Sequence, residues 1–214
     1  MKQGKTLSMV QLALLTALIA MLSFIPYIGY IKIPVLAVQA TTIHIPVIVG
    51  SILLGPKAGG FLGFVFGLTS LINNTTQPGL TAFCFSPFIS MGEGLGGSPL
   101  ALIVCFLPRI LTGVVPYYVY RGLQKLDKKE GPGKLSLLFA GVAGSMTNTI
   151  LVMGMIYLFF GSAYAAARGI AYEAVLGVIL SVVGINGTIE AVVAALLAGA
   201  ICLAVMKANV LKTK

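Results

Sequence analysis

Apolar residues form long runs along the whole chain, and short groups of polar residues, glycine and proline separate these runs. We distinguish six apolar segments, at about 7–25, 41–55, 57–72, 98–121, 135–160 and 172–206. A hydrocarbon core of about 30 Å is crossed by roughly 20 helical residues. The pattern therefore predicts an all-α membrane protein, a compact bundle of six transmembrane helices that forms a single domain over residues 1–214.

The second and third segments are short for complete spans, and only "GPK" (55–57) separates them. One long kinked helix over 44–72 is the alternative. Proline disfavours it, because proline removes a helical hydrogen bond and biases the preceding residue away from the helical conformation. We therefore expect two short helices that pack inside the bundle or line a cavity.

Composition and charge support a membrane location. Hydrophobic residues make up 58% of the chain and charged residues only 9%, against about 25% charged in soluble domains. With a cytoplasmic N-terminus, eleven of the 14 lysines and arginines lie in the cytoplasm, Lys32 and Arg168 lie outside, and Arg109 lies within the membrane. The positive-inside rule then predicts that both termini are cytoplasmic. The net charge of +9 reflects this topology, so we predict no nucleic-acid partner.

Arg109 is the most unusual residue, because it is the only charged residue in the apolar stretch "VCFLPRILTGVVPYYVY" (104–120). Pro108 frees a local backbone carbonyl and can turn the arginine toward the interior. Two main interpretations stay open: Arg109 pairs with the intramembrane carboxylate of Glu190, or its guanidinium binds a substrate carboxylate bidentately. Extension of the side chain to the membrane surface is a third.

Other polar residues in the apolar segments define a candidate binding patch. Asn148 lies in "GSMTNTILVMG" (144–154), and Asn186 and Glu190 are four residues apart on one helical face. With Arg109 they can line one cavity, although Asn148 can equally form structural hydrogen bonds between helices. His44 begins the second segment, where a structural role is the alternative to ligand binding.

Small residues predict close helix contacts. Ala13 and Ala17 are four apart on the first helix, a spacing that lets another helix approach closely. No cleavage site follows this segment, so we expect it to be retained. Gly60, Gly63 and Gly67 predict close packing of the third segment.

Several chemistries have no support in the sequence. It contains no phosphate-binding G-x-x-x-x-G-K-[ST] motif, no metal-ligand spacing and three isolated cysteines. One histidine and five acidic residues offer few catalytic pairs. We expect a binding subunit, with no catalytic residue, cofactor or metal, whose transport energy comes from elsewhere. An integral membrane enzyme using Glu190 or His44, and a self-sufficient facilitator or channel, are the alternatives.

The chain resembles the substrate-binding S-components of energy-coupling factor (ECF) vitamin transporters. The supporting residues are Ala13-x-x-x-Ala17, "TTIHIPVIVGSILLGPKAGGFLGFVFGLTS" (41–70), "LPRILTG" (107–113), "TNTILV" (147–152) and "NGTIEAVVAA" (186–195). The resemblance implies a vitamin-binding subunit of the bacterial plasma membrane. It also implies docking through Ala13 and Ala17 onto a transmembrane coupling subunit, with two cytoplasmic ATPases driving import.

Within this family the chain is most similar to the pantothenate-specific members. The resemblance makes Arg109, Asn148, Asn186 and Glu190 pocket candidates. Pantothenate offers a carboxylate, an amide and two hydroxyls for such side chains. The sequence has no tryptophan, which favours a small aliphatic ligand, although Phe83, Phe85 and Tyr164 can stack on a flat one. Folate, riboflavin and cobalamin are the alternative ligands.

Overall fold

The computed structural model describes residues 2–25, 29–33, 38–90, 97–124 and 133–212. The basic stretch at 125–132 and part of the long connection predicted between 73 and 98 lie outside the described residues. The helices are α1 (Lys2–Phe24), α2 (His44–Leu54), α3 (Pro56–Thr76), α4 (Leu100–Gln124), α5 (Lys134–Arg168), α6 (Tyr172–Val182) and α7 (Thr188–Lys212). A π-helical turn, η3 (Val183–Gly187), joins α6 to α7 without a break, and η2 (Ala82–Cys84) is a short 3₁₀ helix. The six predicted helical segments are confirmed.

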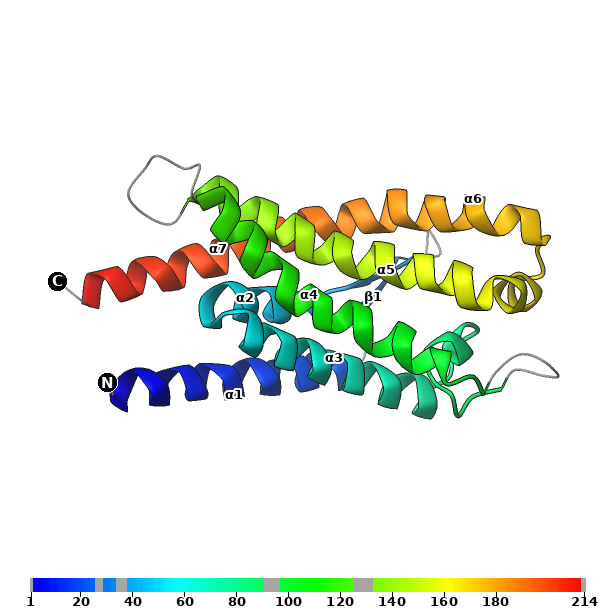
Figure 1. Cartoon of the computed structure of the whole chain (residues 1–214), viewed down its shortest axis with the longest axis horizontal. Coiled ribbons are helices and arrows are strands. Elements are labelled where there is room, and N and C mark those ends of the chain that lie inside the picture. The colour runs from blue at the N-terminus through cyan, green and yellow to red at the C-terminus, as the bar shows by residue number, and fades with distance from the viewer. Residues whose placement is uncertain (1, 26–28, 34–37, 91–96, 125–132, 213–214) are drawn as a thin grey trace.

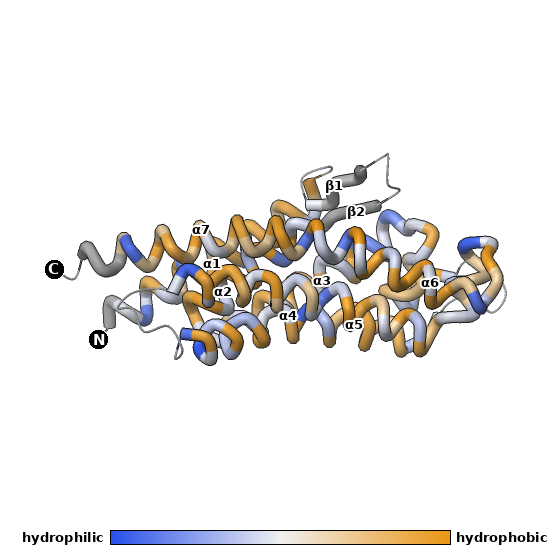
Figure 2. Tube along the Cα trace, turned by 90° about the horizontal axis from the view of Figure 1, so that it is seen from above, coloured by the Kyte–Doolittle hydropathy of each residue, from blue (hydrophilic) through white to orange (hydrophobic). Residues whose placement is uncertain are grey.

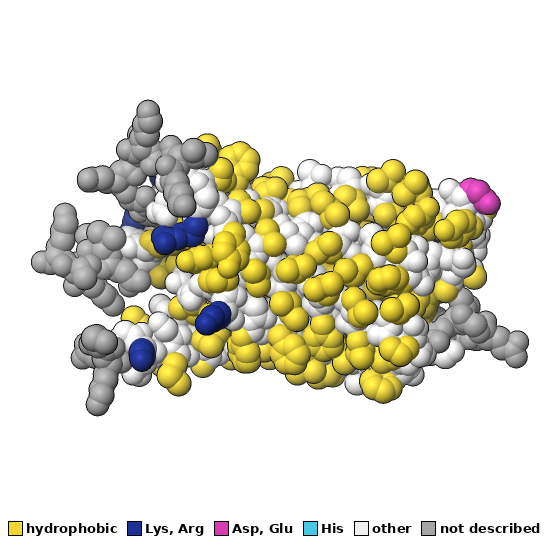
Figure 3. Space-filling view, in the orientation of Figure 1, with side chains coloured by type: hydrophobic (Ala, Val, Ile, Leu, Met, Phe, Trp, Pro, Cys, Tyr) yellow, Lys and Arg dark blue, Asp and Glu magenta, His cyan; other side chains and the backbone are white. Residues whose placement is uncertain are grey.

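The long helices run roughly along one axis, and both termini lie at the same end of the bundle (Figure 1). Among the described residues, four helical stretches are long and apolar enough to cross a membrane: 4–24, 100–124, 134–168 and 172–208. Apolar residues follow these helices in Figure 2, and apolar side chains are spread over the middle of the face seen in Figure 3. This surface is that of a multi-pass membrane protein.

The predicted and observed bounds of helices α2 and α3 agree only in part. Helix α2 has 11 residues and is too short to span a bilayer, and its first nine residues are buried inside the bundle. Helix α3 has 21 residues and extends to Thr76, so the expected end at residue 72 is wrong. Gly55, with φ of 94°, separates the two helices and Pro56 begins the second, as the break at 55–57 predicts.

The core surrounds α2. On one side Ile48 packs with Leu137 of α5 and with Ala194 and Ala198 of α7. On the other side Val47 belongs to a buried cluster with Ile19 of α1 and with Leu62 and Phe66 of α3. Helix α2 is therefore enclosed by the other helices, and the residues at its start, from His44 on, are buried among them.

Glycines set the contact between α3 and α4. A Cβ on Gly59 would collide with the carbonyl oxygen of Gly113, and one on Gly63 would collide with the carbonyl of Arg109. A Cβ on Gly67 would lie 2.8 Å from the Phe106 ring. Close packing is confirmed at Gly63 and Gly67.

Gly63→Ala is expected to destabilise the protein by about 1–3 kcal/mol, because the added methyl group overpacks the backbone of α4 beside Arg109. Gly60→Ala is the matched control: its Cβ would lie 3.4 Å from a Val114 methyl group, so this variant should unfold near the parent temperature. Thermal unfolding in one detergent compares the three proteins. Equal melting temperatures for the two variants would contradict the packing described above.

A two-stranded sheet occupies the connection between α1 and α2, where the prediction of an all-α protein included no strand. Strands β1 (Tyr30–Ile33) and β2 (Val38–Thr41) pair antiparallel, with Tyr30 opposite Thr41. Both contain the β-branched residues that favour strands. Helix α2 begins only at His44, because residues up to Thr41 belong to β2.

Candidate functional site

Residues from four helices share one level of the bundle. Helices α2, α4 and α7 run toward the end that holds the termini, and α5 runs away from it (Figure 1). A Cβ on Gly144 of α5 would lie 2.7 Å from Ile48 of α2 and 2.8 Å from Pro116 of α4, so these three positions are neighbours. His44 lies one helical turn further from the termini than Ile48, and Asn148 lies one helical turn further from the termini than Gly144. They are therefore at similar heights.

Glu190 connects α7 to two other elements at this level. Its Oε1 accepts a hydrogen bond from the backbone N–H of Thr41 at 2.7 Å and one from the Thr41 hydroxyl at 3.0 Å. Its Oε2 accepts a hydrogen bond from the Thr149 hydroxyl at 3.2 Å. The Glu190 side chain is only 7% exposed. Neither Thr41 nor Thr149 was predicted as a site residue, although Thr149 directly follows Asn148 in the sequence.

Arg109 lies inside α4 and is also 7% exposed. Its Nη1 donates a hydrogen bond of 2.7 Å to the carbonyl oxygen of Val104. In a regular helix the N–H of residue 108 would occupy that carbonyl, but Pro108 has no N–H. The arginine thus uses a carbonyl that proline leaves free, and this turns its guanidinium inward as predicted.

Two aromatic rings flank the guanidinium of Arg109. Its central carbon lies 5.0 Å from the ring centre of Phe85 and 5.6 Å from that of Phe66, distances at which a cation is attracted to an aromatic face. The hydrogen bonds described for Glu190 come from the two threonines.

Three of the predicted residues carry buried polar atoms without a hydrogen-bond partner in the described part of the chain. These atoms are His44 Nε2, Asn148 Oδ1 and Asn186 Oδ1, and Ser145 Oγ of the same α5 segment shares this property. The other ring nitrogen of His44 lies 3.5 Å from the Thr41 hydroxyl. An unsatisfied buried polar atom costs about 1–3 kcal/mol. A polar ligand that reaches these atoms would recover part of that free energy.

Phe83 has surroundings unlike those of the other predicted residues. It is fully buried in η2 and meets Phe160 edge-to-face with ring centres 6.0 Å apart, within an apolar cluster that includes Val104. Phe85, two residues later, is the aromatic side chain beside Arg109. The sequence identified the aromatic pair but not which member lies next to the cation.

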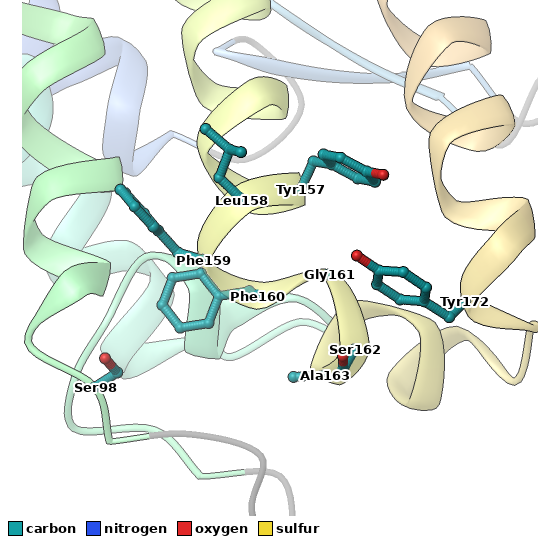
Figure 4. Close-up of a pocket in the computed structure, with 9 residues that line it drawn as sticks. All are labelled: Ser98, Tyr157, Leu158, Phe159, Phe160, Gly161, Ser162, Ala163 and Tyr172. Carbon is teal, nitrogen blue, oxygen red and sulfur yellow. The ribbon is translucent and has the colours of Figure 1, made fainter.

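A separate cavity of about 350 Å³ lies between the end of α5 and the start of α6 (Figure 4). Tyr157 and Tyr172 stack there with ring centres 6.3 Å apart, and exposed Leu158 borders it. None of the predicted site residues lines this cavity. The five predicted binding residues other than Phe83 carry buried polar atoms between the helices, and we call this region the buried polar level: His44, Arg109, Asn148, Asn186 and Glu190.

Ala13 and Ala17 lie on an exposed face of α1. Large apolar residues adjoin them, with Leu14 65% and Met21 51% exposed, while Ile19 on the other face is buried. The two alanines therefore form a shallow strip in an apolar surface, available to a partner helix.

Comparison with known proteins gives one family and two relatives. The model of the family "ECF transporter, substrate-specific component" matches residues 7–202. The chain is 40% identical over 172 residues to the pantothenic acid transporter PanT of Lactococcus lactis subsp. cremoris, which covers 80% of each chain. It is 28% identical over 203 residues to the pantothenate transporter PanT of Leuconostoc mesenteroides subsp. mesenteroides, covering 94% of this chain and 93% of the relative.

Proposed function

This chain belongs to the family of ECF transporter substrate-specific components, and we propose that it binds pantothenate at the buried polar level between α2, α4, α5 and α7. Membership of this family makes the chain a transport component of the cell membrane, and we expect it to have no enzymatic activity of its own. Both relatives described above are named as pantothenate transporters. Their names support the choice of ligand.

The single observation that carries the site is the set of buried polar atoms of His44, Asn148 and Asn186 that have no hydrogen-bond partner among the described residues. Pantothenate has one carboxylate for Arg109 and an amide and two hydroxyls for His44, Asn148 and Asn186. The unpartnered atoms of Asn148 and Asn186 are buried amide oxygens, which accept hydrogen bonds. The hydroxyl and amide groups of pantothenate supply the matching donors. Apolar helices around this level exclude water, which strengthens each polar contact.

For transport we propose a transmembrane coupling subunit and two cytoplasmic ATPases as partners. The exposed strip with Ala13 and Ala17 supports the first of these, because small residues in an apolar face permit close helix packing. Lysine and arginine side chains gather at the end of the bundle that holds the termini (Figure 3). By the positive-inside rule we assign this end to the cytoplasm.

Asn148→Ala and Asn186→Ala should each weaken pantothenate binding about two- to tenfold, since one hydrogen bond contributes about 0.5–1.5 kcal/mol. Equilibrium binding of radiolabelled pantothenate to the purified chain measures the effect. Asn74→Ala is the matched control, because the Asn74 amide bonds to Ser70 within its own helix at 2.8 Å. Parent-like binding by both asparagine variants would exclude the proposed polar level as the site.

A further inference from the structure

One acidic side chain attaches the β1–β2 sheet to the helices. Thr41 is the last residue of β2, and its N–H and hydroxyl both donate to Glu190 Oε1 at 2.7 and 3.0 Å. The Thr149 hydroxyl of α5 donates to Glu190 Oε2 at 3.2 Å. Three donors from two elements thus meet on a carboxylate supplied by a third.

The backbone around Glu190 is specialised for this contact. The π-helical turn η3 ends at Gly187, three residues before Glu190, and both η3 and α7 contact β2. π-Helical turns are rare in proteins, and those that occur are often found at functional sites. A Cβ on Gly187 would lie 3.2 Å from a Thr149 methyl group, so glycine lets α7 approach α5 here. The close approach is what brings Glu190 within reach of Thr149.

Direct contact between Glu190 and a ligand is a poor explanation for its three hydrogen bonds. An ionised carboxylate has about four acceptor positions, and the chain itself fills three of them. Its negative charge would also repel an anionic ligand held nearby. The same three contacts suit an attachment point, because they tie β2 to α5, which carries Asn148, and to α7, which directly follows the η3 turn that carries Asn186.

We propose that Glu190, Thr41 and Thr149 form a clasp that holds the β1–β2 sheet against the binding level and so sets the rate at which bound ligand escapes. Glu190 is then a positioning residue and not a ligand contact. The effect on escape rests on the proposed pantothenate binding, whereas the clasp itself is a contact of the ligand-free chain.

Two measurements on the full chain in detergent test the clasp. Hydrogen exchange of the ligand-free protein should show the Thr41 amide exchanging at least tenfold faster in Glu190→Ala, because that N–H loses its acceptor. The dissociation rate of radiolabelled pantothenate should rise about three- to tenfold in Thr149→Val, which keeps the side-chain volume and removes the hydroxyl. The association rate should change less than the dissociation rate in this variant.

Thr147→Val is the matched control, because the Thr147 hydroxyl bonds to the Ala143 carbonyl within α5. It should match the parent in both measurements. Unchanged exchange at Thr41 in Glu190→Ala, or faster exchange with no change in the dissociation rate of Thr149→Val, would overturn the proposal. Absence of pantothenate binding by the parent would instead overturn the proposed ligand, and the exchange data would still decide whether Glu190 holds the sheet. Should Glu190→Ala fail to fold, Glu190→Met, which keeps a similar side-chain length and has no oxygen acceptor, takes its place in the exchange experiment.

Discussion

Arg109→Ala is expected to weaken pantothenate binding by roughly thirtyfold to several thousandfold while the helical fold persists. Removing one partner of a buried charged pair costs about 2–5 kcal/mol, which corresponds to this range. Arg109 is 7% exposed and lies between two aromatic rings, so water can replace it poorly as a partner for a carboxylate. Titration of the purified variant measures the loss.

The alcohol analogue of pantothenate, which has a hydroxyl in place of the carboxylate, makes this prediction specific. The parent should prefer pantothenate strongly, and Arg109→Ala should lose most of that preference. Arg121→Ala is the matched control, because Arg121 lies over the Tyr117 ring at 6.0 Å but is exposed near the basic end. A different outcome would show that Arg109 has a structural role. In that case Arg109→Ala would lose affinity for both ligands equally and melt at a lower temperature, and Glu190→Gln would behave in the same way.

Ala17→Trp is expected to abolish uptake, to less than about a tenth of the parent rate, and to leave pantothenate binding unchanged. Ala17 and Ala13 are exposed on α1, so a large side chain disturbs no internal contact. It would separate α1 from a helix that packs closely against the small residues. Binding and import are thereby assigned to different surfaces of the chain.

Uptake of labelled pantothenate by cells that produce the complete transporter tests this separation, with binding to the purified variant measured in parallel. Leu196→Trp is the matched control, because Leu196 is 60% exposed on α7 and lies outside the proposed interface. Parent-like uptake by both Ala13→Trp and Ala17→Trp would exclude this face of α1 as the docking surface. Loss of uptake in Leu196→Trp would show that any added bulk at the surface interferes.

The helices were predictable because each is encoded locally. A run of about 20 apolar residues needs no distant partner to form a helix in a membrane, and Gly55 with Pro56 marks the break between α2 and α3. The inward direction of Arg109 was also local, since Pro108 precedes it and frees the Val104 carbonyl four residues earlier. These features lie within one or two helical turns.

The contacts that complete the site are distant in sequence and were not predictable. Thr41 and Glu190 are 149 residues apart, and no periodic pattern links the first residue of the second predicted segment to a residue in the sixth. The π-helical turn at 183–187 has no signal in a pattern of apolar positions, yet it directly precedes the stretch that carries Glu190. The choice of Phe85 over Phe83 as neighbour of Arg109 depends on how η2 folds onto α4.

Calorimetric titration of the purified, detergent-solubilised chain with pantothenate, folate, riboflavin and cobalamin tests the central claim most directly. We expect one-to-one binding of pantothenate with a nanomolar dissociation constant, which corresponds to a binding free energy of about −12 kcal/mol. The other three vitamins should give no heat of binding. Binding of a different vitamin, with no response to pantothenate, would contradict the proposed ligand while keeping the family. Absence of binding to all four would contradict the proposed site itself.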